Sequence, residues 1–216
     1  EDGRVHIQHV SAKESVVAIE QAKAAGVQIT AEVSPHHLTL TDEAVKSLDA
    51  NFKMNPPLRA ESDRHALIEG LRSGAIDCVA TDHAPHSSDE KEVPVEEAAF
   101  GVIGLETAFA VSYTHLVKAK VIKLPRLIDL LSCGPARVFK LPGGSLHAGS
   151  LGDVTLLDVD AKWDVPRDFQ PKAFNSPFIG QTLQGRVVAT VVAGEIRYQQ
   201  QPHHERSKAQ ARRHRR

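Results

Sequence analysis

The first eighty residues alternate between short apolar runs and segments with apolar side chains at helical spacing. Val5 to Val10 alternates as a strand does, and Ala12 to Ala25 carries apolar residues every three or four positions before Gly26. Two more strands and two more helices are predicted by the same patterns. They are strands at 27–33 and 76–81 and helices at 41–48 and 62–73. The order β-α-β-α-α-β predicts a parallel sheet with right-handed crossovers, although three strands alone are too few for an open sheet or a barrel.

The pattern then changes from helix to strand. Helical spacing continues over Gly104 to Val117, Leu124 to Leu131 and Pro135 to Phe139. After Gly152 the residues favour strands, which we expect at 153–158, 186–193 and 195–198, with the last two joined as a hairpin at Gly194. A small β subdomain is therefore expected to close the fold. Residues 199–216 are rich in Gln, His and Arg without an apolar period, which predicts a disordered tail.

Composition and charge exclude several classes of protein. With 41% hydrophobic and 25% charged residues in a chain of 216, the protein can bury a core and is neither disordered nor fibrous. Six Lys and Arg lie in the tail against one acid, so the rest of the chain is net acidic, which argues against nucleic acid or an anionic membrane as partner. No apolar run is long enough for a membrane span, and no signal pattern is seen. A cytoplasmic protein is expected.

The cysteines and the single methionine add two expectations. Cys78 and Cys133 lie far apart in apolar segments, which indicates free thiols in a reducing compartment rather than a disulfide. The chain begins with Glu1 and its only methionine is Met54, so we expect a piece of a longer protein.

Polar residues that could bind a metal ion or take part in catalysis lie where the predicted strands end. His9 follows the first strand, Pro35-His36-His37 follows the second, and Thr81-Asp82-His83-Ala84-Pro85-His86 follows the third. In a barrel, the carboxyl ends of the strands carry the active site. Imidazole and carboxylate groups on adjacent strand ends are also what a hydrolytic zinc site needs, because they bind the ion and leave a position for water.

Each of these residues also has a purely structural interpretation. A lone histidine at a strand end is more often a hydrogen-bonded loop residue than a ligand, and an aspartate there can cap a turn or a helix. His36 and His37, next to a proline, are as readily structural as functional, and the histidines of the tail are expected to be solvated. The coincidence of three polar strand ends favours a site.

Five sequence motifs resemble class I dihydroorotases of the amidohydrolase superfamily, in order and in spacing. They are HVS at 9–11, SPHHL at 34–38, MNPPLR at 54–59, TDHAPH at 81–86 and FGVIGLET at 100–107, and the resemblance extends from about residue 5 to 198. It implies an α/β fold, namely the C-terminal part of a TIM-type (β/α)8 metal-dependent hydrolase barrel, strands 6 to 8, in residues 1–140. A small β-sandwich subdomain in 141–198 and a disordered basic tail in 199–216 are expected to follow.

The resemblance also implies a role for individual residues. His9 corresponds to a metal ligand, and Asp82 to the catalytic carboxylate that also contacts a metal, with one or two zinc ions in the complete enzyme. Asn55 and His86 match residues that bind the substrate, and Phe100 and Gly101 match a loop whose backbone contacts it. The implied reaction is the reversible hydrolysis of dihydroorotate to carbamoyl aspartate in pyrimidine biosynthesis, with Asp82 carrying the proton from the attacking water to the leaving nitrogen.

Other residues that the family uses are not found in this sequence. The His-x-His of the first barrel strand, the bridging ligand of the fourth and the histidine of the fifth are expected upstream of residue 1, and Arg59 cannot replace the arginine that the family places beside the first pair. We therefore expect this chain alone to be inactive, because zinc bound by only two protein ligands should be held weakly.

Three alternatives remain open from the sequence. Allantoinases, hydantoinases and dihydropyrimidinases share the barrel and the metal site, but Asn55 and His86 could bind a ring carboxylate that hydantoin-type substrates lack. A non-catalytic dihydroorotase-like subunit that scaffolds aspartate transcarbamoylase ranks second, because His9 and Asp82 are retained. Either a homo-oligomer or a complex with that transcarbamoylase is thus expected as partner. The third alternative is a nucleic-acid binder that acts through the tail, but the basic residues of the tail are not interleaved with the aromatic residues that such sites use.

Overall fold

The first layer of the fold is a parallel sheet of three strands. The structure is a computed structural model that describes residues 3–167 and 173–200. The strands pair in the order β1-β2-β3, with Val5 opposite Ile29 and Glu32 opposite Cys78. The elements of this part are β1 (Val5–Ile7), α1 (Lys13–Ala24), β2 (Ile29–Val33), α2 (Pro35–Thr39), η1 (Asp42–Ser47), η2 (Ala50–Phe52), α3 (Glu61–Ser73) and β3 (Cys78–Val79). The parallel sheet predicted from the sequence is confirmed.

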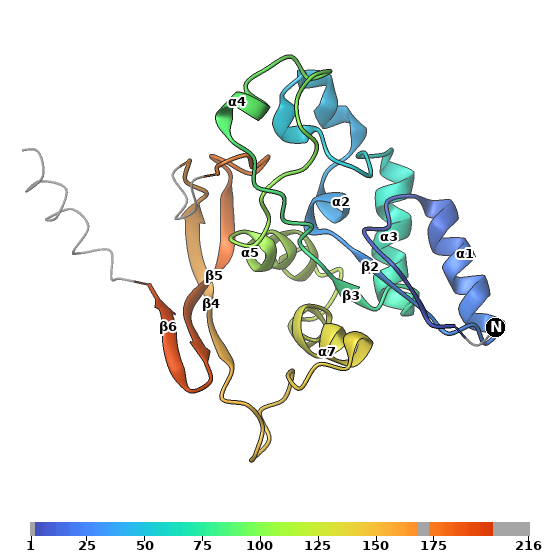
Figure 1. Cartoon of the computed structure of the whole chain (residues 1–216), viewed down its shortest axis with the longest axis vertical. Helices are drawn as coiled ribbons and strands as arrows, with labels where there is room; N and C mark the ends of the chain where they lie inside the picture. Colours follow the sequence, from blue (N-terminus) through green and yellow to red (C-terminus); the bar gives the residue numbers. More distant parts are fainter. Residues whose placement is uncertain (1–2, 168–172, 201–216) are drawn as a thin grey trace, which may run out of the picture.

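One face of this sheet is apolar and is covered by helices α1 and α3 (Figure 1). Alternate strand residues such as Ala31, Val33 and Val79 are fully or almost fully buried against Val16 of α1 and Leu71 of α3. Side chains on the other face are polar. This arrangement makes the sheet a platform whose strand ends carry the polar loops.

A run of helices follows in the sequence, and one of them, α5, lies between the two sheets. It consists of α4 (Ser88–Lys91), α5 (Ala108–Ser112), the π-helical turn η3 (Tyr113–Lys118), α6 (Leu124–Ile128), the π-helical turn η4 (Asp129–Cys133) and α7 (Gly134–Phe139). All five residues of α5 are buried, because this helix packs against α2 on one side and β5 on the other (Figure 1). Within the part of the chain that is described, no helix combines the length and the apolar character that a membrane crossing requires.

The second sheet is antiparallel and lies on the side of the molecule away from α1 (Figure 1). Its strands are β4 (Val154–Asp164), β5 (Thr182–Val192) and β6 (Glu195–Gln199). The predicted hairpin is confirmed, since Ala193 (φ 52°) and Gly194 (φ 80°) form the two-residue turn between β5 and β6. Two successive residues with positive φ are typical of the type I′ turn that suits the twist of paired strands.

Several predicted elements differ in the structure. Residues 41–48 are not an α-helix: Asp42–Ser47 is the 3-10 helix η1, and none of its residues is buried, so no packing stabilises a longer helix. The predicted strand 76–81 shrinks to β3, although Asp77 and Ala80 still donate backbone hydrogen bonds to β2. Helix α5 begins at Ala108 rather than at 104.

The strand that was expected to end at Asp158 continues to Asp164. A short helix that the pattern did not predict, α2, begins after Ser34, whose Oγ accepts a hydrogen bond from the His37 amide. The predicted tail begins too early: Gln199 belongs to β6, and the Gln200 amide donates to the carbonyl of Val188. The remainder of that tail, 201–216, lies outside the described residues.

Candidate active site at the strand ends

His9 and Asp82 follow β1 and β3, and both have an unusual backbone conformation. Their φ angles are 35° and 49°, in the left-handed region that residues other than glycine rarely adopt. The other four such residues of the described chain lie at or next to helix ends or in the hairpin turn; they are Leu48, Lys120, Lys140 and Ala193. A strained backbone at a strand end away from any cap is a frequent feature of functional sites. Both positions are the ones that the sequence nominated as metal ligands.

Two buried imidazole nitrogens at these strand ends have no hydrogen-bond partner. They are Nδ1 of His9 and Nε2 of His36, counted within the described residues. Burial, followed by the nearby His37 and His9, lowers the pKa of His36 well below its usual value, which keeps this imidazole neutral. A neutral imidazole with a free nitrogen lone pair can bind a metal ion. Without such a partner, a buried polar nitrogen costs free energy of folding.

His37 has a structural role, unlike its neighbour. Its Nδ1 lies 2.7 Å from the Ser34 hydroxyl and its Nε2 lies 2.9 Å from the carbonyl oxygen of Pro56. Because a carbonyl can only accept, Nε2 carries the proton and Nδ1 accepts from the hydroxyl. Burial is the largest influence on the pKa of His37 and lowers it, in keeping with the neutral form. His37 therefore ties α2 to the loop that contains Asn55.

His83 organises the next loop through its Nδ1. Its Nδ1 accepts hydrogen bonds from the backbone amides of Gly104 (3.0 Å) and Leu105 (3.3 Å). His83 also forms a parallel β-bridge with Val102, and the Ala84 amide donates to the Val102 carbonyl at 2.9 Å. The TDHAPH and FGVIGLET motifs, about twenty residues apart in sequence, are thereby joined side by side.

His86, Phe100 and Gly101, all nominated for substrate binding, are brought together. Nε2 of His86 donates to the Phe100 carbonyl at 2.8 Å, and Nδ1 of His86 lies 3.4 Å from a Glu90 carboxylate oxygen. The Gly101 amide donates to the Lys53 carbonyl at 3.0 Å. Gly101 has φ 107°, and a Cβ there would lie 2.5 Å from the Ala84 Cβ, so only glycine allows the two loops to approach this closely.

Asn55 is exposed on the segment between Lys53 and Pro56, which contacts both the Gly101 amide and His37. The structure thus places Asn55 on the same rim, although it records no contact between its side chain and His86 among the described residues. Arg59, at the end of the same motif, donates from Nε to the Ser11 hydroxyl at 3.1 Å and so connects this segment to the loop after β1.

Two residues at this site were missed by the sequence interpretation, Lys91 and Asn175. The Lys91 ammonium is buried and donates to the carbonyls of Ala99 (2.9 Å) and Gly101 (3.0 Å), and burial lowers its pKa to about 8. Asn175 is buried between the same loops. Neither lies in one of the motifs, and buried lysines are rare enough that nothing local in the sequence indicates them.

A second group of possible ligands lies on the polar face of the first sheet, one residue from each strand. His6, Glu32 and Cys78 have ligand atoms that all lie within 4.8 Å of one another. His6 already has partners at both nitrogens, the Thr30 hydroxyl at 2.8 Å and Glu32 at 3.1 Å. Burial raises the pKa of Cys78 to about 12, so the thiol stays protonated. His6 and Glu32 are thus paired with each other, and the Cys78 thiol beside them is neutral.

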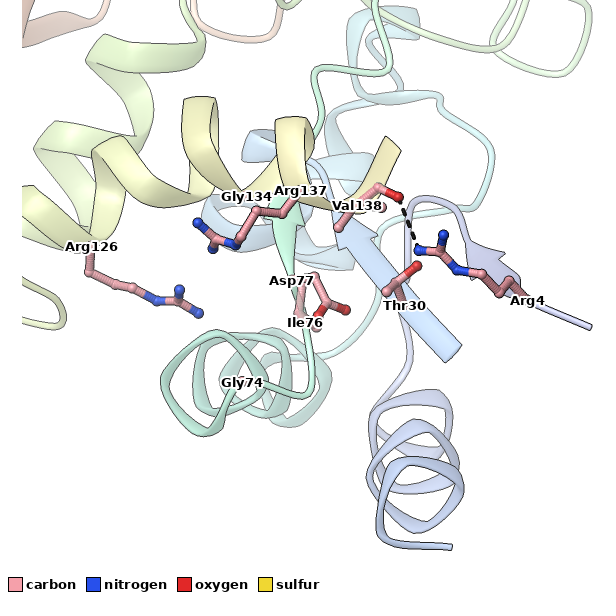
Figure 2. Close-up of a pocket in the computed structure, with 9 residues that line it drawn as sticks. All are labelled: Arg4, Thr30, Gly74, Ile76, Asp77, Arg126, Gly134, Arg137 and Val138. Atoms are coloured by element: carbon pink, nitrogen blue, oxygen red, sulfur yellow. Dashed lines mark hydrogen bonds between the residues drawn. The ribbon is translucent and has the colours of Figure 1, made fainter. Parts of the chain in front are cut away.

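A cavity of about 300 Å³ lies at the opposite end of the sheet, near the amino ends of the strands (Figure 2). Its charged lining is already paired: Arg126 and Arg137 both bind Asp129, at 2.7 and 2.8 Å, and Asp77 binds Lys23 at 2.8 Å. Figure 2 shows the remaining arginine, Arg4, directed at the Val138 carbonyl. The cavity lies at the other end of the sheet from His9 and Asp82, and its paired charges leave little to bind a substrate. It is therefore not the candidate active site.

The strand-end residues offer the donor types of a divalent metal site, although the ligand atoms that lie within 4.8 Å of one another in the described residues are those of His6, Glu32 and Cys78. Unpartnered imidazole nitrogens of His9 and His36 and the carboxylate of Asp82 are donors of the kind found in catalytic zinc sites. The charge of His9 acts on His36, and the charges of His9 and Asp82 both act on His37, each altering the pKa of the imidazole concerned. Such a site suits hydrolysis, because a carboxylate beside a metal ion can serve as a general base.

Comparisons with known proteins agree with this chemistry. The sequence profile of the Amidohydrolase family matches residues 3–197. A dihydroorotase of Listeria monocytogenes (serotype 4b, strain CLIP80459) is 52% identical over 194 residues, which cover 89% of this chain and 46% of the relative. A dihydroorotase of Halalkalibacterium halodurans is 52% identical over 192 residues, covering 88% of this chain and 45% of the relative. The chain thus spans about half the length of the curated relatives it matches.

Among solved structures, an L-hydantoinase (dihydropyrimidinase) from Arthrobacter aurescens superimposes with a TM-score of 0.86 at 30% identity. The match covers 92% of this chain and 46% of that protein. A dihydropyrimidinase from Brevibacillus agri gives a TM-score of 0.83 at 25% identity and covers 90% of this chain and 44% of that protein. The fold of this chain is thus similar to that of about half of each of these two proteins.

Proposed function

This chain belongs to the amidohydrolase family, and we propose that the complete protein is a dihydroorotase that reversibly hydrolyses (S)-dihydroorotate to N-carbamoyl-L-aspartate. The observation that carries the proposal is the pair of strained strand-end residues, His9 and Asp82, next to buried unpartnered imidazole nitrogens. The identity of about half of all residues with two dihydroorotases supports this substrate over others of the family. The reaction would serve pyrimidine biosynthesis in the cytoplasm.

The proposed architecture extends beyond these residues. We assign β1, β2 and β3 to strands 6 to 8 of a (β/α)8 barrel, with residues 1–140 as its C-terminal part. Residues 141–198 would contribute β4, β5 and β6 to a β-sandwich. Three parallel strands cannot close a barrel, and the match to half the length of the relatives is consistent with further strands elsewhere.

His9 and Asp82 are the residues that we propose to hold the metal, with zinc as the ion whose ligand preferences they fit. A bound divalent cation would supply the Lewis acidity that makes water attack on an amide carbonyl feasible at neutral pH. Both residues hold a left-handed backbone at the rim where β1 and β3 end. The free energy of metal binding would offset the cost of this strain.

Asp82 is proposed to move the proton. Its carboxylate would accept the proton of the attacking water and then deliver it to the ring nitrogen that leaves as the amide bond breaks. This transfer conserves protons within the site, and the same carboxylate serves both directions of a reversible reaction. Burial lowers the pKa of His37 and the charge of Asp82 opposes that shift, so this carboxylate lies beside the neutral histidines at the strand ends.

The substrate is proposed to lie between Asn55 and the loops of His86 and Phe100-Gly101. In the structure both nitrogens of His86 have protein neighbours, the Phe100 carbonyl and Glu90. A ring carboxylate would therefore replace the Phe100 carbonyl as the acceptor for Nε2. An anionic acceptor makes a stronger hydrogen bond than a carbonyl does, so the exchange is favourable. Asn55, exposed on the neighbouring segment, supplies an amide to the same end of the ring.

A second candidate is a hydantoinase-type activity, favoured by the structural match to the L-hydantoinase. The discriminating feature is the carboxylate on the dihydroorotate ring, which hydantoins and dihydrouracil lack. A non-catalytic subunit that scaffolds aspartate transcarbamoylase is a further candidate, and it would bind no metal at these residues.

The test is a measurement of substrate preference in a complete polypeptide. We define the completed enzyme as these 216 residues fused to the part of the Listeria monocytogenes relative that the match leaves uncovered. With zinc, it should hydrolyse dihydroorotate in preference to hydantoin and dihydrouracil, and the 216-residue chain alone should not. Preference for hydantoin would replace this proposal by the second candidate. Absence of turnover and of bound metal in a folded completed enzyme would support the scaffold.

A further inference from the structure

Asn175 connects two loops that lie far from it in the sequence. Its side-chain amide Nδ2 donates to the carbonyl of Ala84 at 2.9 Å and to the carbonyl of Gly101 at 3.2 Å. Its Oδ1 accepts from the backbone amide of His86 at 3.1 Å. The backbone carbonyl of Asn175 accepts from the Ile103 amide at 3.0 Å. One buried residue thus contacts both sides of the proposed substrate rim.

The chemistry of these partners requires an asparagine. Two of the three are carbonyl oxygens that can only accept, and the third is an N–H that can only donate, so the orientation of the amide is fixed. An aspartate would place a carboxylate oxygen against two carbonyl oxygens, and an alanine would leave all three groups without this partner. Because the Asn175 side chain is 3% exposed, water cannot easily replace it.

The position of Asn175 in the chain is also informative. It lies on the segment that leads into β5, so a residue next to the antiparallel sheet controls loops at the ends of the parallel one. Lys91 shares the Gly101 carbonyl with Asn175 and holds the same loop. Lys91 does not contact the His86 loop in the described residues. Asn175 therefore bonds to both the His86 backbone and the Gly101 carbonyl, in addition to the direct bond between His86 Nε2 and the Phe100 carbonyl.

We propose that Asn175 is a positioning residue for substrate specificity, which holds the His86 backbone and the Phe100-Gly101 loop at the separation that fits a carboxylated ring. The inference rests on the proposed function, because it assigns a purpose to loops whose substrate is itself proposed. Asn175 touches no reacting atom in this account. It acts on binding through His86, so its loss should raise KM rather than slow the proton transfer at Asp82.

A matched control is available at the next residue. Ser176 is buried to the same degree, at 2% exposed, and its hydroxyl accepts a hydrogen bond from the Phe178 amide within its own segment. Ser176→Ala removes a buried hydrogen bond without touching either loop. If Asn175 were only structural, Asn175→Ala and Ser176→Ala should have the same effect on kinetics.

The first measurement is steady-state kinetics on the completed enzyme. Asn175→Ala should raise KM for dihydroorotate by about 10-fold, with kcat changed by less than about 3-fold, whereas Ser176→Ala should leave KM unchanged. In a His86→Ala background, Asn175→Ala should raise KM by clearly less than about 10-fold, because the route through the His86 side chain is gone and only the contact with the Gly101 loop remains. Equal KM values for the two single variants, or a full effect in the His86→Ala background, would overturn the proposal.

The second measurement needs no turnover and separates this inference from the proposed function. Amide hydrogen exchange of the 216-residue chain, followed by NMR, reports the bond between the His86 amide and Asn175 directly. Protection of that amide should fall by about 10-fold in Asn175→Ala and not in Ser176→Ala. Retained protection overturns the positioning role even if the enzyme is active. If protection is lost but the completed enzyme does not hydrolyse dihydroorotate, the contact between Asn175 and the His86 amide stands and the proposed substrate is wrong.

Discussion

Gly101→Ala tests the close approach of the two rim loops with a single methyl group. A Cβ at Gly101 would lie 2.5 Å from the Ala84 Cβ, far inside the roughly 3.5–4.0 Å at which carbon atoms pack. The residue would also keep a φ of 107° that side chains rarely adopt. Gly74, which ends α3, is the matched control, because it has φ 87° and nothing lies within 4 Å of its Cβ position.

The two variants separate backbone strain from steric overlap. Gly74→Ala should cost about 1–2 kcal/mol of the free energy of unfolding, from the left-handed backbone alone. Gly101→Ala should cost about 2–5 kcal/mol, because the overlap with Ala84 adds about 1–3 kcal/mol. Neither Ala84 nor its backbone can move without breaking the hydrogen bonds to Val102 and Asn175.

Denaturant unfolding of the completed enzyme and its two variants, at fixed zinc concentration, measures the difference as a shift of the midpoint at constant slope. Gly101→Ala should also raise KM, because relief of the overlap separates the loops that bind the substrate. If Gly101→Ala were no more destabilising than Gly74→Ala and left KM unchanged, the close packing of the two loops would be wrong.

Three further predictions follow from individual residues. His9→Ala should lower the zinc content of the completed enzyme, with activity partly restored by excess zinc; full metal occupancy by elemental analysis would contradict its role as ligand. Burial lowers the pKa of Lys91 from 10.5 to about 8, so between these pH values the unfolded chain binds more protons and stability should rise with pH relative to Lys91→Met. A parallel pH dependence of the two unfolding free energies would exclude this. Cys78, buried and with its pKa raised to about 12, should resist alkylation in the folded protein while the partly exposed Cys133 reacts; mass spectrometry would reveal equal labelling if this were wrong.

The elements that the sequence predicted well are those with a strong local period. Helices α1 and α3 each bury a stripe at three- and four-residue spacing, and β2 ends where Ser34 and Pro35 break the apolar run. The segment that became η1 shows the limit of this reasoning. Its Thr-Asp-Glu opening is typical of a helix start, but without a buried face it forms only a short 3-10 helix.

The positions of His9 and Asp82 after strands were predictable from the sequence, whereas their left-handed backbones carry no signal in it, and their roles at the site stay a prediction. The roles of His37 and His83 could not be separated from those of ligands in advance. Their bonds to Pro56 and to the Gly104 amide form between segments about twenty residues apart. Asn175 was missed for the same reason, because its partners lie more than seventy residues away.

The kcat of Asp82→Asn in the completed enzyme tests the central claim most directly. The substitution keeps the size of the side chain but removes its basic oxygen, so the proposed proton carrier is lost while the substrate rim of Asn55 and His86 is untouched. We predict a fall in kcat of roughly 10²- to 10⁴-fold for dihydroorotate hydrolysis, with KM changed much less. A kcat close to that of the unsubstituted enzyme, at equal zinc content, would contradict the assignment of Asp82 and with it this account of the site.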